Sequence, residues 1–106
     1  MTECIQVTTT VETQDDADNL TRLVLQKRLA ACVQVFSCCS SYHWQGVIEK
    51  ENELKLVMKS HLKLYPELEK LILANHPYDT PEILATPVQF CNSDYLDWMA
   101  GELKSE

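Results

Sequence analysis

The chain has 106 residues, with 9 basic and 16 acidic side chains and a formal net charge of −7 at pH 7. This length predicts a single domain over residues 1–106, and 45% apolar with 24% charged residues is the balance of a globular protein. The negative charge argues against nucleic acid or an anionic membrane as a partner, because both are recognised through a basic surface.

Strand-like and helical patterns alternate in the first half of the chain. Alternating β-branched residues at 4–11 predict a strand with one buried face. Thr13 and the acids after it predict the start of a helix, along which Ala17, Leu20 and Val24 recur at helical spacing. Two long strands follow, about 33–44 and 47–59, joined near a glycine as a hairpin. They exceed the usual five or six residues, so we expect their ends to extend beyond the domain's own core.

The second half repeats the order with weaker signals. Leucines at helical spacing predict a helix over roughly 62–75, and His76-Pro77 ends it because the residue before proline avoids the α region. A turn-rich segment leads to a strand over 83–90, which Pro87 confines to a sheet edge or a bulge. Asn92 or Ser93 can cap a short final helix.

This order of elements predicts an α+β fold. The sequence β-α-β-β-α-β gives a ferredoxin-like antiparallel sheet backed by two helices, with an extra C-terminal helix. The second face of the sheet would be bare in a monomer, so we expect an oligomer that covers it. The long hairpin supports a trimer, since copies in a ring can pair every exposed strand edge through one repeated contact.

The sequence patterns predict neither a membrane span nor a secretion signal. Its apolar runs fall short of the roughly 20 residues that cross a bilayer, and residues 1–6 lack the basic and long apolar regions of a signal peptide. We therefore expect a cytoplasmic protein whose five cysteines are reduced. The cysteine spacings contain no C-x-x-C pair, which disfavours a disulfide framework and a structural zinc site.

Taken alone, the residues define no catalytic centre. There is no Gly-rich phosphate loop, nucleophile elbow or H-E-x-x-H helix, so we predict a protein that is not an enzyme. A lone histidine is more often a capping or surface residue than a ligand, and free cysteines are commonly small core residues. Cys38 and Cys39 are neighbours on a strand and face opposite ways, so they cannot share a metal unless the strand is bulged.

Four motifs in order resemble the CutA family of divalent-cation tolerance proteins. They are K-R-L-A-A-C-V at 27–33, Y-H-W-Q-G-V-I at 42–48 followed by Glu53 and Lys59, H-P-Y-D-T-P-E at 76–82 and D-Y-L-D-W at 94–98. The resemblance implies a non-catalytic ferredoxin-like homotrimer, similar in architecture to the PII nitrogen-signalling proteins and linked to copper and other divalent metals. It implies no obligatory cofactor, with Cu²⁺ or another divalent cation as the expected ligand.

The same motifs supply the candidate site residues. His76, with Cys32 as a thiol in a neighbouring motif, is the candidate metal ligand. Thr9 and Asn75 stand where some bacterial relatives carry a metal-associated cysteine and a second histidine, and hydroxyl and amide groups are poor copper ligands. We therefore expect weak metal binding.

A second hypothesis is a PII-like signalling trimer that holds a small molecule in clefts between subunits. The motif residues expected near such a cleft are Trp44, Glu53, Lys59, Tyr78 and Glu82. As an alternative, Trp44 and Tyr78 pack an interface while Glu53 and Lys59 pair across strands.

Overall fold

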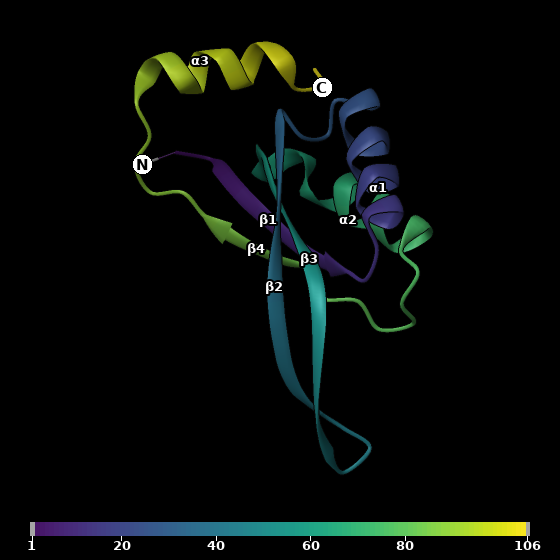
Figure 1. Cartoon of the computed structure of the whole chain (residues 1–106). Helices are drawn as coiled ribbons and strands as arrows, with labels where there is room; N and C mark the ends of the chain where they lie inside the picture. The colour runs from purple at the N-terminus through teal and green to yellow at the C-terminus, as the bar shows by residue number, and fades with distance from the viewer. Residues whose placement is uncertain (1, 106) are drawn as a thin grey trace.

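The computed structural model describes residues 2–105 and contains one antiparallel sheet (Figure 1). Its strands are β1 (Cys4–Val11), β2 (Cys32–Trp44), β3 (Val47–His61) and β4 (Leu84–Pro87), in the spatial order β2-β3-β1-β4. This is the strand order of the ferredoxin-like fold, so the predicted fold class is confirmed.

Helices make the connections between the strands. Helix α1 (Gln14–Gln26) joins β1 to β2, and the 3₁₀ turn η1 (Leu62–Leu64) leads from β3 into α2 (Tyr65–Asn75). Helix α3 (Ser93–Glu102) follows β4 as the expected terminal helix. None of the helices within residues 2–105 is long and apolar enough to span a membrane.

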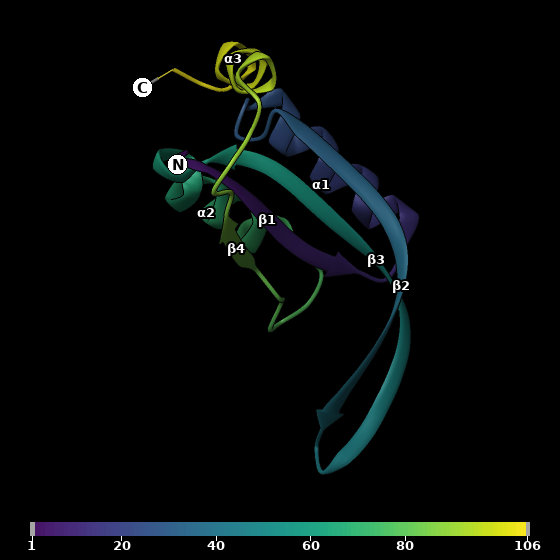
Figure 2. The ribbon, with the colours of Figure 1, turned by 90° about the vertical axis from the view of Figure 1, so that its left-hand side faces the viewer.

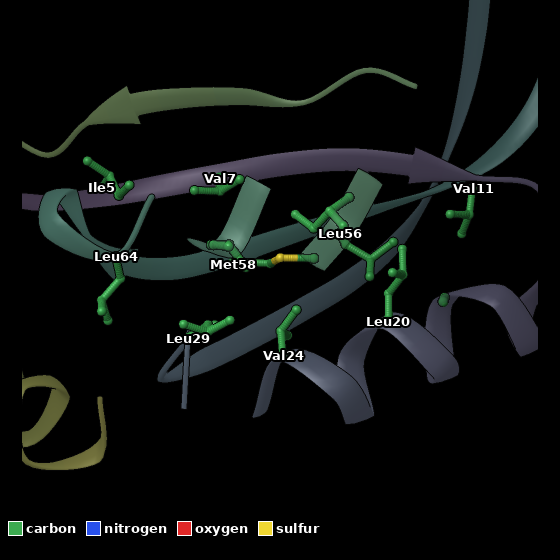
Figure 3. Packing of buried hydrophobic residues seen from close by; sticks show 13 residues of the cluster. Ile5, Val7, Val11, Leu20, Val24, Leu29, Leu56, Met58 and Leu64 are labelled. Carbon is green, nitrogen blue, oxygen red and sulfur yellow. The ribbon is translucent and has the colours of Figure 1, made fainter. Parts of the chain in front are cut away.

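The hydrophobic core lies between the sheet and helices α1 and α2 (Figure 3). On β1 and β3, Val7 lies opposite Met58, and both side chains face the helices and are fully buried. The alternation predicted for β1 therefore sets which face is covered. The helices contribute Ala17, Leu20 and Val24 from α1 and Leu68 and Ile72 from α2.

Helix α1 begins and ends through identifiable local contacts. Thr13 Oγ1 accepts a hydrogen bond from the Asp16 N–H at 3.1 Å, which confirms the predicted N-cap. At the other end Arg28 adopts a left-handed φ of 55°, and the Leu29 N–H donates to the Val24 carbonyl at 3.0 Å. This is a Schellman motif, and it turns Leu29 into the core.

The two ends of the hairpin differ in what pairs with them. Strand β1 pairs with β3 only as far as Val11 opposite Leu54, and beyond that point β2 and β3 pair with each other alone. We call residues 38–53 the hairpin arm. It projects away from the rest of the domain (Figures 1 and 2), and the molecule measures 45 × 26 × 21 Å. The predicted extension beyond the core is thus present.

A tight turn closes the hairpin arm. Trp44 lies opposite Val47, and the two residues between them, Gln45 and Gly46, have φ values of 49° and 85°. Positive φ at both central positions is the requirement of a type I′ turn, for which glycine is suited because it has no Cβ.

Strand β4 is shorter than the predicted 83–90. It pairs with β1 only from Leu84 opposite Thr8 to Pro87 opposite Ile5. Proline has no N–H to donate, so the regular ladder ends there, although the Val88 N–H still reaches the Cys4 carbonyl at 3.0 Å. Asn92 is the N-cap residue of α3, without a side-chain hydrogen bond to the helix.

The face of the sheet away from α1 and α2 is only partly covered. Helix α3 lies at one end of it, where Met99 Sδ is 3.8 Å from the buried Cys4 Sγ. Farther along the same face, Phe36 and Leu84 remain 50% and 57% exposed. The bare face expected for one copy is therefore reduced by α3 but not removed.

Candidate functional site

The loop after α2 meets the base of the hairpin arm and the end of β1. His76, the C-cap of α2, has Nε2 3.1 Å from Thr9 Oγ1 and 3.0 Å from the Thr10 carbonyl oxygen. Its Nδ1 accepts a hydrogen bond from the Tyr78 N–H at 3.1 Å. An accepting Nδ1 and a Nε2–H that donates to Thr10 describe a neutral ring with both nitrogens occupied.

The electrostatics of His76 agree with this neutral form. Burial lowers its pKa, and the hydrogen bond to Thr10 and the charges of Asp16 and Glu53 oppose that shift only in part. The ring therefore carries no proton on Nδ1 near neutral pH, which keeps the Tyr78 N–H bonded.

Tyr78 connects this histidine to the hairpin arm. Its hydroxyl donates to Glu53 Oε2 at 2.8 Å, and its ring lies 4.9 Å from the His76 ring, centroid to centroid. Burial, together with the hydrogen bond and charge of Glu53, raises the pKa of Tyr78 above its usual range. The phenol therefore remains a donor, and it satisfies a carboxylate whose residue is only 8% exposed.

An open hollow of about 550 Å³ lies at the base of the hairpin arm. Glu53 is the first β3 residue beyond the last β1 pair and lies opposite Cys38 on β2. The hollow has no basic residue in its lining, which consists of Glu12, Ser37, Cys38, Cys39, Asn52, Glu53 and Leu54. Its volume falls in the range of small-molecule sites.

Of the five cleft candidates, Glu53 and Tyr78 are brought together and the others are not. Trp44 lies at the far end of the hairpin arm, beside the turn. Lys59 lies near the opposite end of β3, with Nζ 5.5 Å from the centroid of the Tyr95 ring. Glu82 is exposed in the loop before β4. Within one protomer these five residues form no single cleft.

The two metal candidates are also separated. Cys32 lies opposite Lys59, on the sheet face away from α1 and α2, whereas Thr9 and its partner His76 lie on the helix side. Two strand spacings and three residues of rise put Cys32 roughly 14 Å from Thr9. Asn75 Nδ2 donates to the Leu71 carbonyl of its own helix at 2.9 Å, so this amide group is engaged within α2.

The donor set around His76 therefore does not fit a preformed metal centre. Among residues 2–105 no three His, Cys, Asp or Glu side chains are grouped to hold a metal ion. The β2–β3 register runs without a bulge through Cys38 and Cys39, so these two thiols face opposite ways as expected. The partner that sequence reasoning missed is the Thr10 carbonyl, because no side-chain pattern marks a backbone acceptor.

Comparison with known proteins gives a consistent result. Residues 5–102 match the family of CutA1 divalent ion tolerance proteins. The divalent-cation tolerance protein CutA of Yersinia pestis is 39% identical over 100 residues, which cover 93% of this chain and 84% of that protein.

Solved structures extend the similarity to three dimensions. CutA1 from Pyrococcus horikoshii matches with a TM-score of 0.92 at 34% identity, over 95% of this chain and 99% of that one. A protein of Archaeoglobus fulgidus described as a periplasmic divalent cation tolerance protein CutA gives 0.92 at 29% identity, over 95% and 99% of the two chains. The similarity thus spans the core and the hairpin arm together.

Proposed function

Because this chain belongs to the CutA family of divalent ion tolerance proteins, we propose that it acts in divalent-cation tolerance as a non-catalytic homotrimer. The observation that carries the proposal is the family match over residues 5–102, in a domain whose hairpin arm pairs with no third strand among the described residues. In this proposal the functional unit is the homotrimer, and it takes part in the response to divalent cations.

Exposed strand edges and apolar residues support self-assembly. Strand β2 forms one edge of the sheet along all 13 of its residues. The end of the hairpin arm exposes Trp44, Val47 and Ile48 by 55%, 54% and 70%. Such a surface is an aggregation hazard on an isolated protomer, and a closed ring of copies removes it.

Sedimentation equilibrium tests the assembly. We expect a single species near three times the 12.2 kDa chain mass at micromolar concentration. A folded species at the single-chain mass under those conditions would overturn the trimer.

We propose that divalent cations, Cu²⁺ among them, associate weakly and through His76. A cation at Nδ1 must replace the Tyr78 N–H, and one at Nε2 must replace the Thr10 contact. Each lost hydrogen bond costs on the order of 1 kcal/mol, which argues for weak affinity. Cys32 lies too far away to join the same ion within one protomer.

Isothermal titration with Cu²⁺ and Zn²⁺ tests the role of His76. We expect weak binding that is lost in His76→Gln and retained in His43→Gln, a matched change of an exposed histidine in the hairpin arm. Unchanged copper affinity in His76→Gln would clear His76 of this role and leave the acidic run at 49–53 as the better candidate.

The hollow at the base of the hairpin arm favours a second candidate function, that of a PII-like trimer binding a small molecule. Glu53, one of the expected cleft residues, lines a space of about 550 Å³ and is held by Tyr78. A panel of metabolites screened by thermal shift tests it, with Glu53→Gln as the site variant. Stabilisation by a metabolite that this variant abolishes supports the candidate, and the absence of any stabilisation contradicts it.

For the cellular compartment we propose the cytoplasm. All five cysteines are free, as expected where thiols stay reduced. The Archaeoglobus fulgidus relative is described as periplasmic, so fractionation of cells that express this chain decides the point. Recovery with the periplasmic fraction would contradict the proposal.

A further inference from the structure

We propose that Glu53, Tyr78 and His76 form a clasp that fixes the angle between the hairpin arm and the body of the domain. The clasp thereby sets the geometry in which copies of the chain meet. Its consequence for assembly rests on the proposed homotrimer, but the clasp itself is a property of one protomer.

The hairpin arm needs such support at its base. From the pair Cys38 and Glu53 outward it is a two-stranded ribbon, because β1 has ended at Val11. Two-stranded ribbons twist strongly and are marginally stable without further packing. The direction of the hairpin arm is therefore decided where the third strand stops.

The clasp joins three elements at that point. Glu53 is the first arm residue outside the β1–β3 ladder, and the Tyr78 hydroxyl bonds to it at 2.8 Å. Tyr78 is held in turn by its N–H at 3.1 Å from His76 Nδ1. His76 is fixed in turn by its Nε2, which lies 3.0 Å from the Thr10 carbonyl oxygen of β1. The loop after α2 thus ties the arm side of β3 to the terminal part of β1.

The charges around Glu53 make Tyr78 a specific partner. Glu12 lines the same hollow. The negative charges of Glu12 and Glu51 add to the rise in the pKa of the Tyr78 hydroxyl. A nearly buried carboxylate among other carboxylates requires a donor that stays protonated, and Tyr78 supplies one. Movement of the hairpin arm away from the loop would leave this carboxylate without its donor.

A second tyrosine–glutamate pair offers a matched control. The Tyr65 hydroxyl donates to Glu69 Oε2 at 2.7 Å, but both residues belong to α2. The two hydrogen bonds are chemically alike, and only the one made by Tyr78 connects separate elements. Tyr65→Phe therefore controls for loss of the bond itself.

Hydrogen exchange of backbone amides tests the clasp. In Tyr78→Phe, which keeps the ring against His76, we expect amides at 38–53 to exchange at least ~10-fold faster, while those of β1 stay unchanged. The dissociation constant of the assembly, measured by sedimentation, rises in the same variant by at least ~10-fold. Tyr65→Phe alters neither quantity.

A double-mutant cycle assigns the effect to the contact. In a Glu53→Ala background the Tyr78→Phe change has no further effect on exchange, because the bond is already absent. Should Tyr78→Phe fail to fold, Glu53→Ala alone must show the same faster exchange. Equal exchange of wild type and both single variants overturns the clasp. If the wild type sediments as a monomer, the trimer fails, while the exchange comparison still decides on the clasp.

Discussion

The body of the domain and the hairpin arm use the same two strands, β2 and β3, in different surroundings. In the body, Leu56 and Met58 of β3 are fully buried under α1 and α2. In the hairpin arm, Ile48 of the same strand is 70% exposed. Apolar side chains occur in both regions, but only those of the body lie under a covering layer of helices. The body covers its own apolar residues, whereas the hairpin arm leaves Ile48 exposed to solvent.

The largest expected effect separates folding from association. Leu56→Ala removes a fully buried side chain, so we expect the free energy of unfolding to fall by about 3 kcal/mol, measured by urea denaturation. Ile48→Ala, in contrast, should change the unfolding of a dissociated protomer by less than ~0.5 kcal/mol. A comparable loss in both variants at low protein concentration would erase the proposed difference between body and hairpin arm.

An arm variant should weaken assembly instead. Trp44, 55% exposed next to the turn, offers the largest apolar side chain of the hairpin arm. If copies meet there, Trp44→Ala should cost about 2 kcal/mol of association free energy, seen as a raised dissociation constant by sedimentation. Far-UV circular dichroism of the variant stays unchanged. Association as tight as in the wild type would place the interface elsewhere.

The pH dependence of stability sharpens the comparison at the junction of the two regions. Burial lowers the pKa of His76 in the folded protein below its ordinary value of about 6.5. At pH values between the folded and the unfolded pKa, the unfolded chain therefore binds more protons than the folded one. The contribution of His76 is fully present above pH ~6.5 and is lost as the pH falls toward the folded pKa. We therefore expect the free energy of unfolding to decrease as the pH falls below about 6.5, above the range in which most carboxylates titrate. His76→Gln should remove this slope, and an equal slope in the variant would assign it to another group.

The smallest expected effect is confined to the body. Arg28 pays a steric cost for its φ of 55°, so Arg28→Gly should stabilise the protein by up to ~1 kcal/mol. The exposed ion pair with Glu102 offsets little of this gain. Arg22→Gly, inside α1, should destabilise by about 1 kcal/mol. Thermal melting measures both, and destabilisation by Arg28→Gly would contradict the account of the helix end.

Periodicity was enough to predict the elements, because burial of one face leaves a direct mark on the sequence. The alternating residues of β1 and the apolar stripe of α1 are examples. The unusual length of the two hairpin strands likewise predicted that the hairpin extends beyond the core. Strand β4 ends at Pro87, which has no N–H for the hydrogen-bond ladder, whereas the sequence pattern predicts a strand that continues to residue 90.

The site was harder to predict, because its contacts join residues far apart in the chain. The motifs singled out Glu53, Tyr78 and His76 separately, but their connection depends on the fold. The Thr10 carbonyl leaves no side-chain signature at all. The distance between Cys32 and His76 follows from the position of β3 between β2 and β1, which only the strand order reveals.

The length of the hairpin arm makes it a lever. At about 3.4 Å per residue, the stretch from Glu53 to Val47 is ~20 Å long, so a tilt of ~10° at its base moves the turn by ~3.5 Å. That displacement is directed sideways and approaches the ~4.8 Å spacing between paired strands, so it is large enough to separate two hydrogen-bonded edges. In an assembly built through the hairpin arm, a small rotation beside Glu53 is therefore amplified at the far end, where it would carry Trp44 and Ile48 out of the contacts they make with a second copy.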